Sequence, residues 1–352
     1  MMDLKFFRGK KIFITGHTGF KGSWLAYILY LNGAHIVGYS LKPENKHDNF
    51  YLFELDKKIR NYYYDIRDEK NLKKVITKFK PDIIFHLAAQ SLVNYSYLKP
   101  KLTFLTNAVG TLNILEVCRE IKNIRSIIIV TSDKCYKNYE KKTGYKEKDE
   151  LGGEDPYSSS KTVSENIFYS YLKSFFKSKK NVGLVSVRSG NVIGGGDWSK
   201  DRIIPDLIKS IRTKKKFIVR NPNSSRPWMH VFDTINGYLT LSKKIYGNNK
   251  YNGSWNFGPN HSDIIVKNIL LKILNILKIK KKIVIKKNNK IKETNSLNLN
   301  SKKSRKLLNW RPKLSLKQSL KITGEWYIDF LKNKKQILET SKKQIESFFK
   351  LH

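Results

Sequence analysis

The segment KKIFITGHTGFKGSWL, residues 10–25, reads as a strand that runs into a helix. Its first six residues form the β-branched apolar run of a buried strand, and the helical pattern that begins at Phe20 ends near Gly33. Three glycines, Gly16, Gly19 and Gly22, mark the junction. Glycines at this spacing permit a tight turn, approach of the backbone to a pyrophosphate, and close packing of helix on sheet. We therefore expect a strand, a dinucleotide-binding loop and a helix.

Short apolar runs alternate with helical patterns up to residue 188. We expect strands at 35–40, 61–66, 82–89, 125–132 and 182–188, and helices at 20–33, 69–79, 101–121 and 156–177. Apolar strands separated by helices predict βαβ units and a parallel sheet covered on both faces. The expected fold class is therefore α/β, with a Rossmann-type doubly wound parallel sheet.

The chain after residue 190 is less regular. It opens with GNVIGGGDW (190–198), continues with short elements and a helix at about 232–246, and becomes mostly helical from residue 263. This pattern predicts a smaller, less regular C-terminal substrate lobe set against the sheet. The expected division is a dinucleotide-binding domain of residues 1–188 plus about 230–260, and a substrate-binding lobe of residues 189–229 and 261–345.

The chain is strongly basic, with 69 Lys and Arg against 29 Asp and Glu and a formal net charge of +40. Nucleic-acid-binding proteins usually gather such charge on one face or arm, interleaved with aromatic residues. Here lysine is spread along the whole chain. The densest run, KIKKKIVIKK (278–287), alternates with apolar residues as a surface helix end and a strand would. We therefore expect no specific nucleic-acid partner, although weak association with polyanions at low salt is expected.

Two cysteines, Cys118 and Cys135, cannot form a disulfide framework, which fits a reducing cytoplasm. The N-terminus, MMDLKFFRGKKIFIT, has no apolar signal region, and no stretch approaches the length of a membrane span. We therefore expect a soluble cytoplasmic protein without a membrane partner. No metal site is predicted.

Polar residues follow the apolar run 127–130, where a buried strand is expected to end. The stretch TSDKCY (131–136) places Ser132, Asp133 and Lys134 at this point. Charges there are costly unless they are used or paired, although a solvated strand-end turn would also explain an isolated tripeptide. Because ligands of open α/β sheets bind outside the carboxyl ends of the strands, the tripeptide lies where a functional site is expected.

Tyr157 and Lys161 are four residues apart, so a helix places the phenol and the ammonium on one face. A free phenol has a pKa of about 10 and is a poor base at neutral pH. Lowering that pKa by about three units requires roughly 4 kcal/mol of stabilisation of the anion. A neighbouring lysine and an oxidised nicotinamide ring are both cationic, so together they would supply it.

These three features resemble the extended short-chain dehydrogenase/reductase family, also described as the NAD-dependent epimerase/dehydratase family, over nearly the whole chain. The resemblance places Ser132, Tyr157 and Lys161 at catalytic positions. HLAAQS (86–91) and TNAVGT (106–111) match further family segments. The cofactor-binding residues implied are Gly16, Thr18, Gly19, Phe20, Gly22, Ser40, Asp65, Ile66, Leu87, Ala88, Ala89, Asn107, Tyr157 and Lys161.

The choice between NAD and NADP depends on the end of the second strand. An acid that binds the adenosine ribose usually stands there, whereas this chain has Ser40, Leu41 and Lys42. Lys42 would either meet a 2′-phosphate or be solvated, and solvation is favoured. Asp65 would contact the adenine or cap the following helix. NAD is the expected cofactor, with NADP left open.

Within the resembled family, Asp133 indicates the dehydratase branch. There a carboxylate follows the catalytic serine or threonine because water must be removed across C5–C6 of a sugar, and glutamate usually comes next. This chain has Lys134 instead. Together with GHTGFKGSWL (16–25), DPYSSSK (155–161), GNVIGGGDW (190–198) and RPWMHV (226–231), the lysine implies an NAD-dependent lyase with CDP-glucose as its substrate. The resemblance also implies deoxysugar biosynthesis, such as that of lipopolysaccharide O-antigen, and a homodimer through helices 101–121 and 156–177.

The expected chemistry assigns a role to each catalytic residue. Tyr157, helped by Ser132, would take the proton of the sugar 4-hydroxyl while hydride leaves C4 for the nicotinamide, to be returned later to C6. Asp133, with a raised pKa, would protonate the departing 6-hydroxyl, and Lys134, if neutral, would remove the C5 proton. Because the two charges attract each other and oppose both changes of pKa, the division of labour between them is left open.

Cations in the second lobe are expected to bind the nucleotide, because arginine makes bidentate contacts with phosphate. The implied substrate-binding residues are Gln90, Ser91, Asn191, Arg202, Ile204, Pro205, Arg220, Arg226 and His230. One departure from the family follows HLAAQSLV, where this chain has Asn94-Tyr95 instead of basic residues. Trp198 and Trp228 would stack on a ligand or pack in the core.

Two alternatives are kept. The first is a dehydratase or epimerase that acts on another nucleotide sugar, although Asp133 argues against plain epimerisation. The second is a non-catalytic dinucleotide-binding protein with a basic interaction surface. An intact set of Ser132, Tyr157 and Lys161 argues against it.

Overall fold

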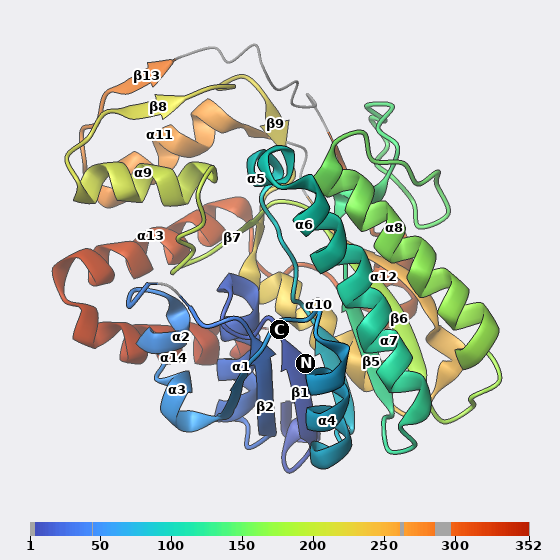
Figure 1. Ribbon diagram of the computed structural model, residues 1–352. Coiled ribbons are helices and arrows are strands. Elements are labelled where there is room, and N and C mark those ends of the chain that lie inside the picture. Colours follow the sequence, from blue (N-terminus) through green and yellow to red (C-terminus); the bar gives the residue numbers. More distant parts are fainter. Residues whose placement is uncertain (1–3, 44, 261–263, 286–296, 352) are drawn as a thin grey trace.

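The computed structural model describes residues 4–43, 45–260, 264–285 and 297–351, and its centre is a seven-stranded sheet (Figure 1). The strand order is β11-β6-β5-β4-β1-β2-β3, and every neighbouring pair is parallel. The predicted α/β doubly wound fold is confirmed. The strands are β1 (Lys11–Thr15), β2 (His35–Ser40), β3 (Arg60–Tyr63), β4 (Ile83–His86), β5 (Ser126–Val130), β6 (Gly183–Ser189) and β11 (Gly253–Phe257).

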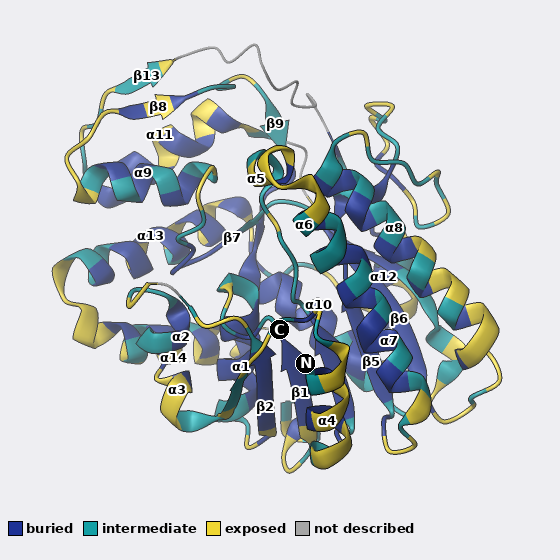
Figure 2. Ribbon diagram, viewed as in Figure 1, coloured by how far each residue is buried: buried dark blue, intermediate teal, exposed yellow. Residues whose placement is uncertain are grey.

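Helices cover both faces of the sheet, because side chains of successive strand residues point to opposite faces. Ile12 and Ile14 belong to a buried cluster with α1 (Phe20–Leu31) and α10 (Val231–Lys244). Phe13, between them, belongs to a second buried cluster, with α4 (Glu69–Phe79), α7 (Gly110–Glu120) and α8 (Pro156–Tyr171). The inner strands of the sheet are mostly buried, whereas the edge strand β3 and the outer faces of α3 (Leu55–Lys58) and α4 are partly exposed (Figure 2).

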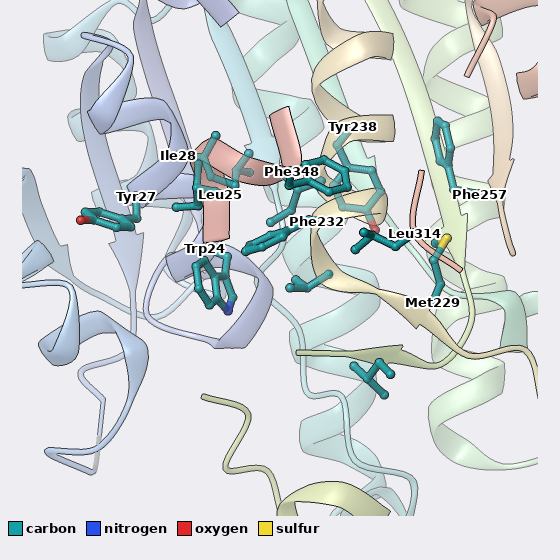
Figure 3. Packing of buried hydrophobic residues seen from close by; sticks show 14 of the residues in the cluster. Trp24, Leu25, Tyr27, Ile28, Met229, Phe232, Tyr238, Phe257, Leu314 and Phe348 are labelled. Carbon is teal, nitrogen blue, oxygen red and sulfur yellow. The ribbon is translucent and has the colours of Figure 1, made fainter. Parts of the chain in front are cut away.

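Aromatic rings link three helices within the first cluster (Figure 3). The rings of Trp24 on α1 and Phe232 on α10 are 4.9 Å apart and nearly perpendicular, and Phe232 lies 5.4 Å from Phe348. Phe348 belongs to the C-terminal helix α14 (Ile337–Lys350). The last helix of the chain therefore packs onto α10, which in turn packs onto α1.

The predicted helices are present, with two irregularities. The helix expected at 101–121 consists of α6 (Pro100–Phe104), a π-helical turn over Leu105–Val109, and α7. The helix expected at 156–177 is α8 followed by a π-helical turn over Leu172–Phe176. The expected strand 61–66 was too long, since β3 ends at Tyr63 and the chain turns at Asp65. Gly33 ends α1 with a φ of +76°, as predicted.

The smaller lobe is built from two-stranded sheets and helices, and its irregular character is confirmed (Figure 1). The strand pairs are β7 (Val192–Ile193) with β10 (Met229–His230), β9 (Ser225–Arg226) with β12 (Ile264–Ile265), and β8 (Phe217–Val219) with β13 (Ile283–Ile285). The helices of this lobe include α9 (Ile203–Arg212), α11 (Val266–Leu277) and α13 (Leu316–Lys332), whereas α12 (Lys302–Leu308) packs against β11 of the large sheet. Part of the lysine-rich run at 278–287 lies outside the described residues. Among the residues described, no helix is long and apolar enough to span a bilayer.

Asp233 ties the segment before α13 to the start of α10. Its buried carboxylate accepts hydrogen bonds from the backbone N–H of Lys313 at 2.7 Å and of Leu314 at 3.4 Å. Burial raises the pKa of Asp233 to about 7, and the two hydrogen bonds oppose this rise. The folded protein therefore holds this proton more tightly than the unfolded chain does. The stabilisation is complete below about pH 4 and is lost as the pH rises through about 7.

Asp233→Asn should flatten the pH dependence of stability between about pH 4 and pH 7, because asparagine does not titrate but still accepts from Lys313. A pKa that differs by one between the folded and the unfolded protein corresponds to about 1.4 kcal/mol, so the wild-type change across this range should be readily measurable. Thermal unfolding of both proteins in a pH series checks this. Parallel curves for the two proteins would contradict it.

Candidate active site

One large cleft of about 770 Å³ runs along the carboxyl ends of the central strands. Its floor is the glycine loop after β1 and the segments that follow β4, β5 and β6, and the small lobe closes it with the start of α9, the end of β8 and the loop after it. This is where a parallel α/β sheet is expected to bind its ligands. The cleft brings together the three motifs that were identified in the sequence.

The glycine loop has two glycines that the fold itself requires and one that it does not. A Cβ on Gly16 would lie 2.6 Å from the backbone nitrogen of Ala88, and a Cβ on Gly22 would lie 2.1 Å from the carbonyl oxygen of Gly16. A Cβ on Gly19 would meet only the Gly16 oxygen, at an ordinary 3.5 Å. Gly19 is also the N-cap of α1 and has no side chain to satisfy the first N–H groups of the helix. These groups and the helix dipole suit a pyrophosphate.

The end of β2 forms the far side of this loop. The hydroxyl of Thr18 lies 2.9 Å from that of Ser40 and donates to the Leu41 carbonyl at 3.0 Å. Asp65 lines the cleft but pairs with Arg67 at 2.6 Å, which holds the pKa of Asp65 below its usual range. The cap of α4 is Asp68, so the alternative that Asp65 caps this helix is wrong.

Lys42 is exposed and is not among the lining residues, as the solvated alternative expects. The remaining predicted cofactor residues except Asn107 line the cleft, namely Phe20, Ile66, Leu87, Ala88, Ala89, Tyr157 and Lys161.

Ser132, Asp133, Tyr157 and Lys161 are all buried and all line the cleft. The Ser132 hydroxyl donates to Asp133 Oδ1 at 2.9 Å and accepts from the N–H of Lys134 at 3.2 Å. Asp155 caps α8 by accepting from the N–H groups of residues 157 and 158, both at 3.0 Å. The cap fixes the first turn of α8, and Tyr157 and Lys161 therefore face the end of β5 from one side of the helix.

Burial disfavours charge in this group. It raises the pKa of Tyr157 to about 12, against the opposing effect of a hydrogen bond to Ser132. It lowers the pKa of Lys161 to about 8, against the opposing charge of Glu165. Burial also raises the pKa of Asp133, opposed mainly by Lys134. Asp133 is therefore suited to donate a proton, and Tyr157 needs added positive charge before it can accept one.

Two predicted residues do not reach the cleft. Asn107 is buried behind it in the π-helical turn, where its amide holds both the N–H and the carbonyl of Gln90, at 2.8 and 2.9 Å, and donates to Ser160 at 2.8 Å. The prediction of direct cofactor contact was wrong, because the side chain is used to brace the loop after β4.

His230 was predicted as a cation facing the substrate, and this was also wrong. It is buried at the start of α10 and accepts from the N–H of Phe232 at 3.2 Å. Burial lowers the pKa of His230 to about 3, so the ring is neutral. The helix begins directly after the two-residue strand β10, and the imidazole serves as its N-cap.

The other predicted substrate residues line the cleft, namely Gln90, Ser91, Asn191, Arg202, Ile204, Pro205, Arg220 and Arg226. Arg202 pairs with Asp197 at 3.0 Å, and Arg220 pairs with Asp201 at 2.7 Å. Asn94 and Tyr95 line it as well.

The two tryptophans have different surroundings. Trp228 borders the cleft and donates to the carbonyl of Ile264 at 3.1 Å. Trp198 packs on Tyr327 and Phe330 and is not among the lining residues.

Lys21 is a cleft residue that the sequence analysis missed. It lies between Gly19 and Gly22, and burial with the nearby cations of Arg202 and Lys161 lowers its pKa to about 7. The glycine motif accepts any residue at this position, so the motif does not indicate that the side chain of Lys21 enters the cleft.

A buried ion pair beneath the site was missed too. Arg188 and Glu165 meet at 2.7 Å, and Glu165 also accepts from Thr131, the residue before Ser132, at 2.5 Å. The pair therefore locks the end of β5 to α8 and β6. Arg188 and Glu165 are 23 residues apart on different elements, so no local spacing in the sequence indicates the pair.

Comparison with known proteins gives concordant matches. Residues 13–323 match the sequence family described as GDP-mannose 4,6 dehydratase. A CDP-glucose 4,6-dehydratase from Salmonella typhimurium is 38% identical over 99% of this chain and 98% of its own length. The fold resembles a UDP-glucose 4-epimerase from Thermotoga maritima with UDP-glucose, at 22% identity, 91% and 99% coverage and a TM-score of 0.80. It also resembles a dTDP-glucose 4,6-dehydratase from Bacillus anthracis in complex with NAD, at 23% identity, 92% and 97% coverage and a TM-score of 0.77.

Proposed function

This chain belongs to the GDP-mannose 4,6 dehydratase family, and within that family we propose that it is a hydro-lyase that converts CDP-glucose to CDP-4-dehydro-6-deoxyglucose and water. One observation carries the proposal. A buried carboxyl with a raised pKa, that of Asp133, lies in hydrogen-bond contact with Ser132 in the pocket that also holds Tyr157 and Lys161. An alcohol oxidation alone needs no such acid, whereas loss of the 6-hydroxyl does.

CDP-glucose is the substrate we propose because the relative that matches this chain end to end is described as acting on it. The Asp133-Lys134 pair agrees with that assignment. Gln90, Asn191 and Arg202 are the proposed sugar and phosphate contacts nearest the catalytic group, with Arg220 and Arg226 on the small lobe.

NAD is the cofactor that we propose, and the site fits it. Gly19 leaves the N-terminus of α1 open to a pyrophosphate, and Ser40 and Asp65 line the cleft where the adenosine half would lie. When bound, NAD supplies the acceptor for hydride from C4 of the sugar and the donor of hydride to C6. No net oxidation results, so the reaction needs no second substrate.

Tyr157 is the proposed base for the 4-hydroxyl. Its phenol pKa of about 12 is too high for this role unless positive charge arrives with the ligands and adds to that of Lys161. Ser132 lies between the phenol and Asp133, hydrogen-bonded to both, and positions the hydroxyl that loses its proton. The C4–H and O–H bonds then break together to give the 4-ketone.

Asp133 and Lys134 carry out the elimination in this proposal. The ketone acidifies the C5 hydrogen, and we assign Lys134 to remove it as a proton. The C6–O bond breaks, Asp133 gives its proton to the leaving oxygen, and water departs. The double bond between C5 and C6 would take at C6 the hydride that the bound cofactor supplies and at C5 the proton held by Lys134, which restores Lys134. The proton that Tyr157 took from the 4-hydroxyl would pass through Ser132 to Asp133 and so restore both groups.

We further propose that the two parts of the chain bind different ligands, with the boundaries expected from the sequence. Residues 1–188 and about 230–260 bind the dinucleotide, and residues 189–229 and 261–345 bind the nucleotide sugar, although part of the last range lies outside the described residues. A homodimer through the helices expected at 101–121 and 156–177 is also proposed. The exposed side chains of Tyr169 and Phe175 on that surface support it. Cys118 and Cys135 are free and buried, which is consistent with the cytoplasmic location we propose.

Two glycine substitutions should separate cofactor binding from folding. Gly19→Ala places a methyl group where the pyrophosphate would approach but makes only ordinary contact within the protein, so we expect unchanged thermal stability and at least about tenfold weaker NAD binding. Gly22→Ala, the matched control, should lower stability even without cofactor, because its Cβ clashes with the Gly16 carbonyl. Calorimetric titration and thermal unfolding measure both effects. Normal NAD affinity in Gly19→Ala would contradict the proposed binding mode.

The proposed reaction is tested by mass spectrometry of the purified protein incubated with NAD and, in turn, with CDP-, UDP-, dTDP- and GDP-glucose and GDP-mannose. Loss of one water from CDP-glucose alone is expected. Loss of water from another nucleotide sugar would leave the chemistry standing and refute the substrate. No change in any of them, in a protein that binds the dinucleotide, would favour the non-catalytic alternative.

A further inference from the structure

The part of the small-lobe wall that α9, the end of β8 and the start of α11 form is mostly apolar but contains one carboxylate, that of Asp206. The apolar lining residues of this part are Ile203, Ile204, Pro205, Ile218, Val219 and Val266. The other charged residues of the small-lobe lining are Asp197, Lys200, Asp201, Arg202, Arg220 and Arg226. Asp201 is accounted for, because it pairs with Arg220 at 2.7 Å. Asp206 takes no part in the proposed reaction, although its half-buried side chain borders the cleft.

The charge of Asp206 restricts what part of a nucleotide sugar can lie beside it. Burial raises the pKa of Asp206 to about 6, and the charge of Asp201 adds to the rise. Lys209, Arg220 and a hydrogen bond with the backbone of Asp201 oppose it. A diphosphate placed there would add repulsion to an anion that is already poorly solvated. The phosphates therefore belong with Arg202, Arg220 and Arg226, and Asp206 must face an uncharged part of the substrate.

The apolar surroundings favour the base over the ribose as that part. A ribose presents hydroxyl groups that need polar partners, whereas a pyrimidine presents two flat faces and a polar edge. The side chains of Ile204, Ile218 and Val266 suit the faces of the ring, and the carboxyl of Asp206 among them suits its edge.

Cytosine differs from uracil and thymine at that edge. At the 4-position cytosine carries an amino group, which donates hydrogen bonds, whereas uracil and thymine carry an oxygen, which only accepts them. A carboxyl oxygen pairs with the amine and repels the oxygen. We propose that Asp206 selects the base of the substrate by accepting a hydrogen bond from the 4-amino group of cytosine, and so excludes UDP- and dTDP-sugars.

This inference rests on the proposed function, and it competes with a purely structural role. Asp206 lies in the first turn of α9, where a negative charge is favourable to the helix dipole, and its own N–H donates to the carbonyl of Arg202 at 2.9 Å. A residue with that role alone would change stability on substitution and leave the choice of base unaltered.

Asp206→Asn is the direct test, since it keeps the shape of the side chain but gives it an N–H₂ group that can face the 4-oxygen of uracil. We expect the ratio of kcat/KM for CDP-glucose to that for UDP-glucose to fall about tenfold to a hundredfold relative to wild type. Asp206→Leu, which cannot pair with either base, should lower turnover of CDP-glucose without raising that of UDP-glucose.

Asp201→Asn is the matched control. It removes the other carboxylate of the same wall and leaves Arg220 without this partner, so it should change kcat/KM for both nucleotide sugars by a common factor. Thermal unfolding of every variant reports any structural effect separately.

The outcomes are distinct. If wild type dehydrates CDP-glucose but Asp206→Asn lowers kcat/KM for both sugars equally, or changes only the melting temperature, the inference is overturned while the proposed function stands. If wild type prefers UDP- or dTDP-glucose, the proposed substrate and this inference fall together. A loss of preference confined to the Asp206 variants supports the inference.

Discussion

Tyr157→Phe should abolish detectable oxidation of the sugar, because it deletes the only group positioned to take the proton of the 4-hydroxyl in the proposed mechanism. A positioned acid or base typically contributes a hundredfold to ten-thousandfold, so we expect kcat to fall by at least about a hundredfold. The phenylalanine fills the same space beside Ser132, and neither NAD affinity nor thermal stability should change greatly. Quenched reactions analysed by mass spectrometry should show unaltered CDP-glucose and no ketone.

Tyr139→Phe is the control for this variant. Its ring is 61% exposed and does not line the cleft, so loss of its hydroxyl should leave turnover unchanged. A Tyr157→Phe protein that oxidised CDP-glucose at the wild-type rate would refute the assigned base.

Asp133→Asn should stop the reaction after oxidation. The amide oxygen can still accept from the Ser132 hydroxyl, so the oxidising group keeps its geometry, but the proton for the 6-hydroxyl is gone. We expect release of the 4-dehydro-6-deoxy product to fall by about a hundredfold or more. A quenched reaction should contain the 4-ketone with its 6-hydroxyl still in place, two hydrogens lighter than CDP-glucose and without loss of water.

The pH dependence of the elimination rate follows from the requirement that Asp133 be protonated. Burial raises the pKa of its carboxyl, and the donor form is the protonated one, so the elimination step in wild type should slow as the pH rises through that raised pKa. In Asp133→Asn this limb should be absent from the residual rate.

Lys134→Ala completes the set and should retard removal of the C5 proton. If Lys134→Ala released product at the normal rate, Lys134 would not be the base. If Asp133→Asn released product normally, Asp133 would not be the acid.

The fold could be predicted from the sequence because most strands are short apolar runs and helical patterns separate them. The glycine spacing at residues 16–22 also needs no tertiary information, since the turn and the helix start are local. β3 was predicted too long because it is an edge strand whose end depends on the Asp65–Arg67 turn. The π-helical turns at 105–109 and 172–176 leave no mark in the hydrophobic pattern.

The site residues also divide into those that local sequence predicts and those that depend on tertiary contacts. Ser132, Asp133, Tyr157 and Lys161 stand in motifs, so their common location follows from the strand order and the start of α8. His230 and Asn107 were assigned to the cleft by residue type and neighbouring motif, yet local hydrogen bonds turn one into a helix cap and the other into a loop brace. Lys21 and Asp206 were not identified from the sequence, because their place at the cleft depends on how the small lobe packs over the sheet.

One experiment joins oxidation, elimination and return of the hydride: conversion of CDP-glucose that carries deuterium at C4, followed by mass spectrometry and fragmentation of the product. We expect one water to be lost and the deuterium to be retained, at C6 of the deoxysugar, because the hydride taken from C4 is returned within the same cleft. Recovery of a sugar that has kept its oxygen, or of a deoxysugar from which the deuterium has been lost, would contradict the proposed reaction.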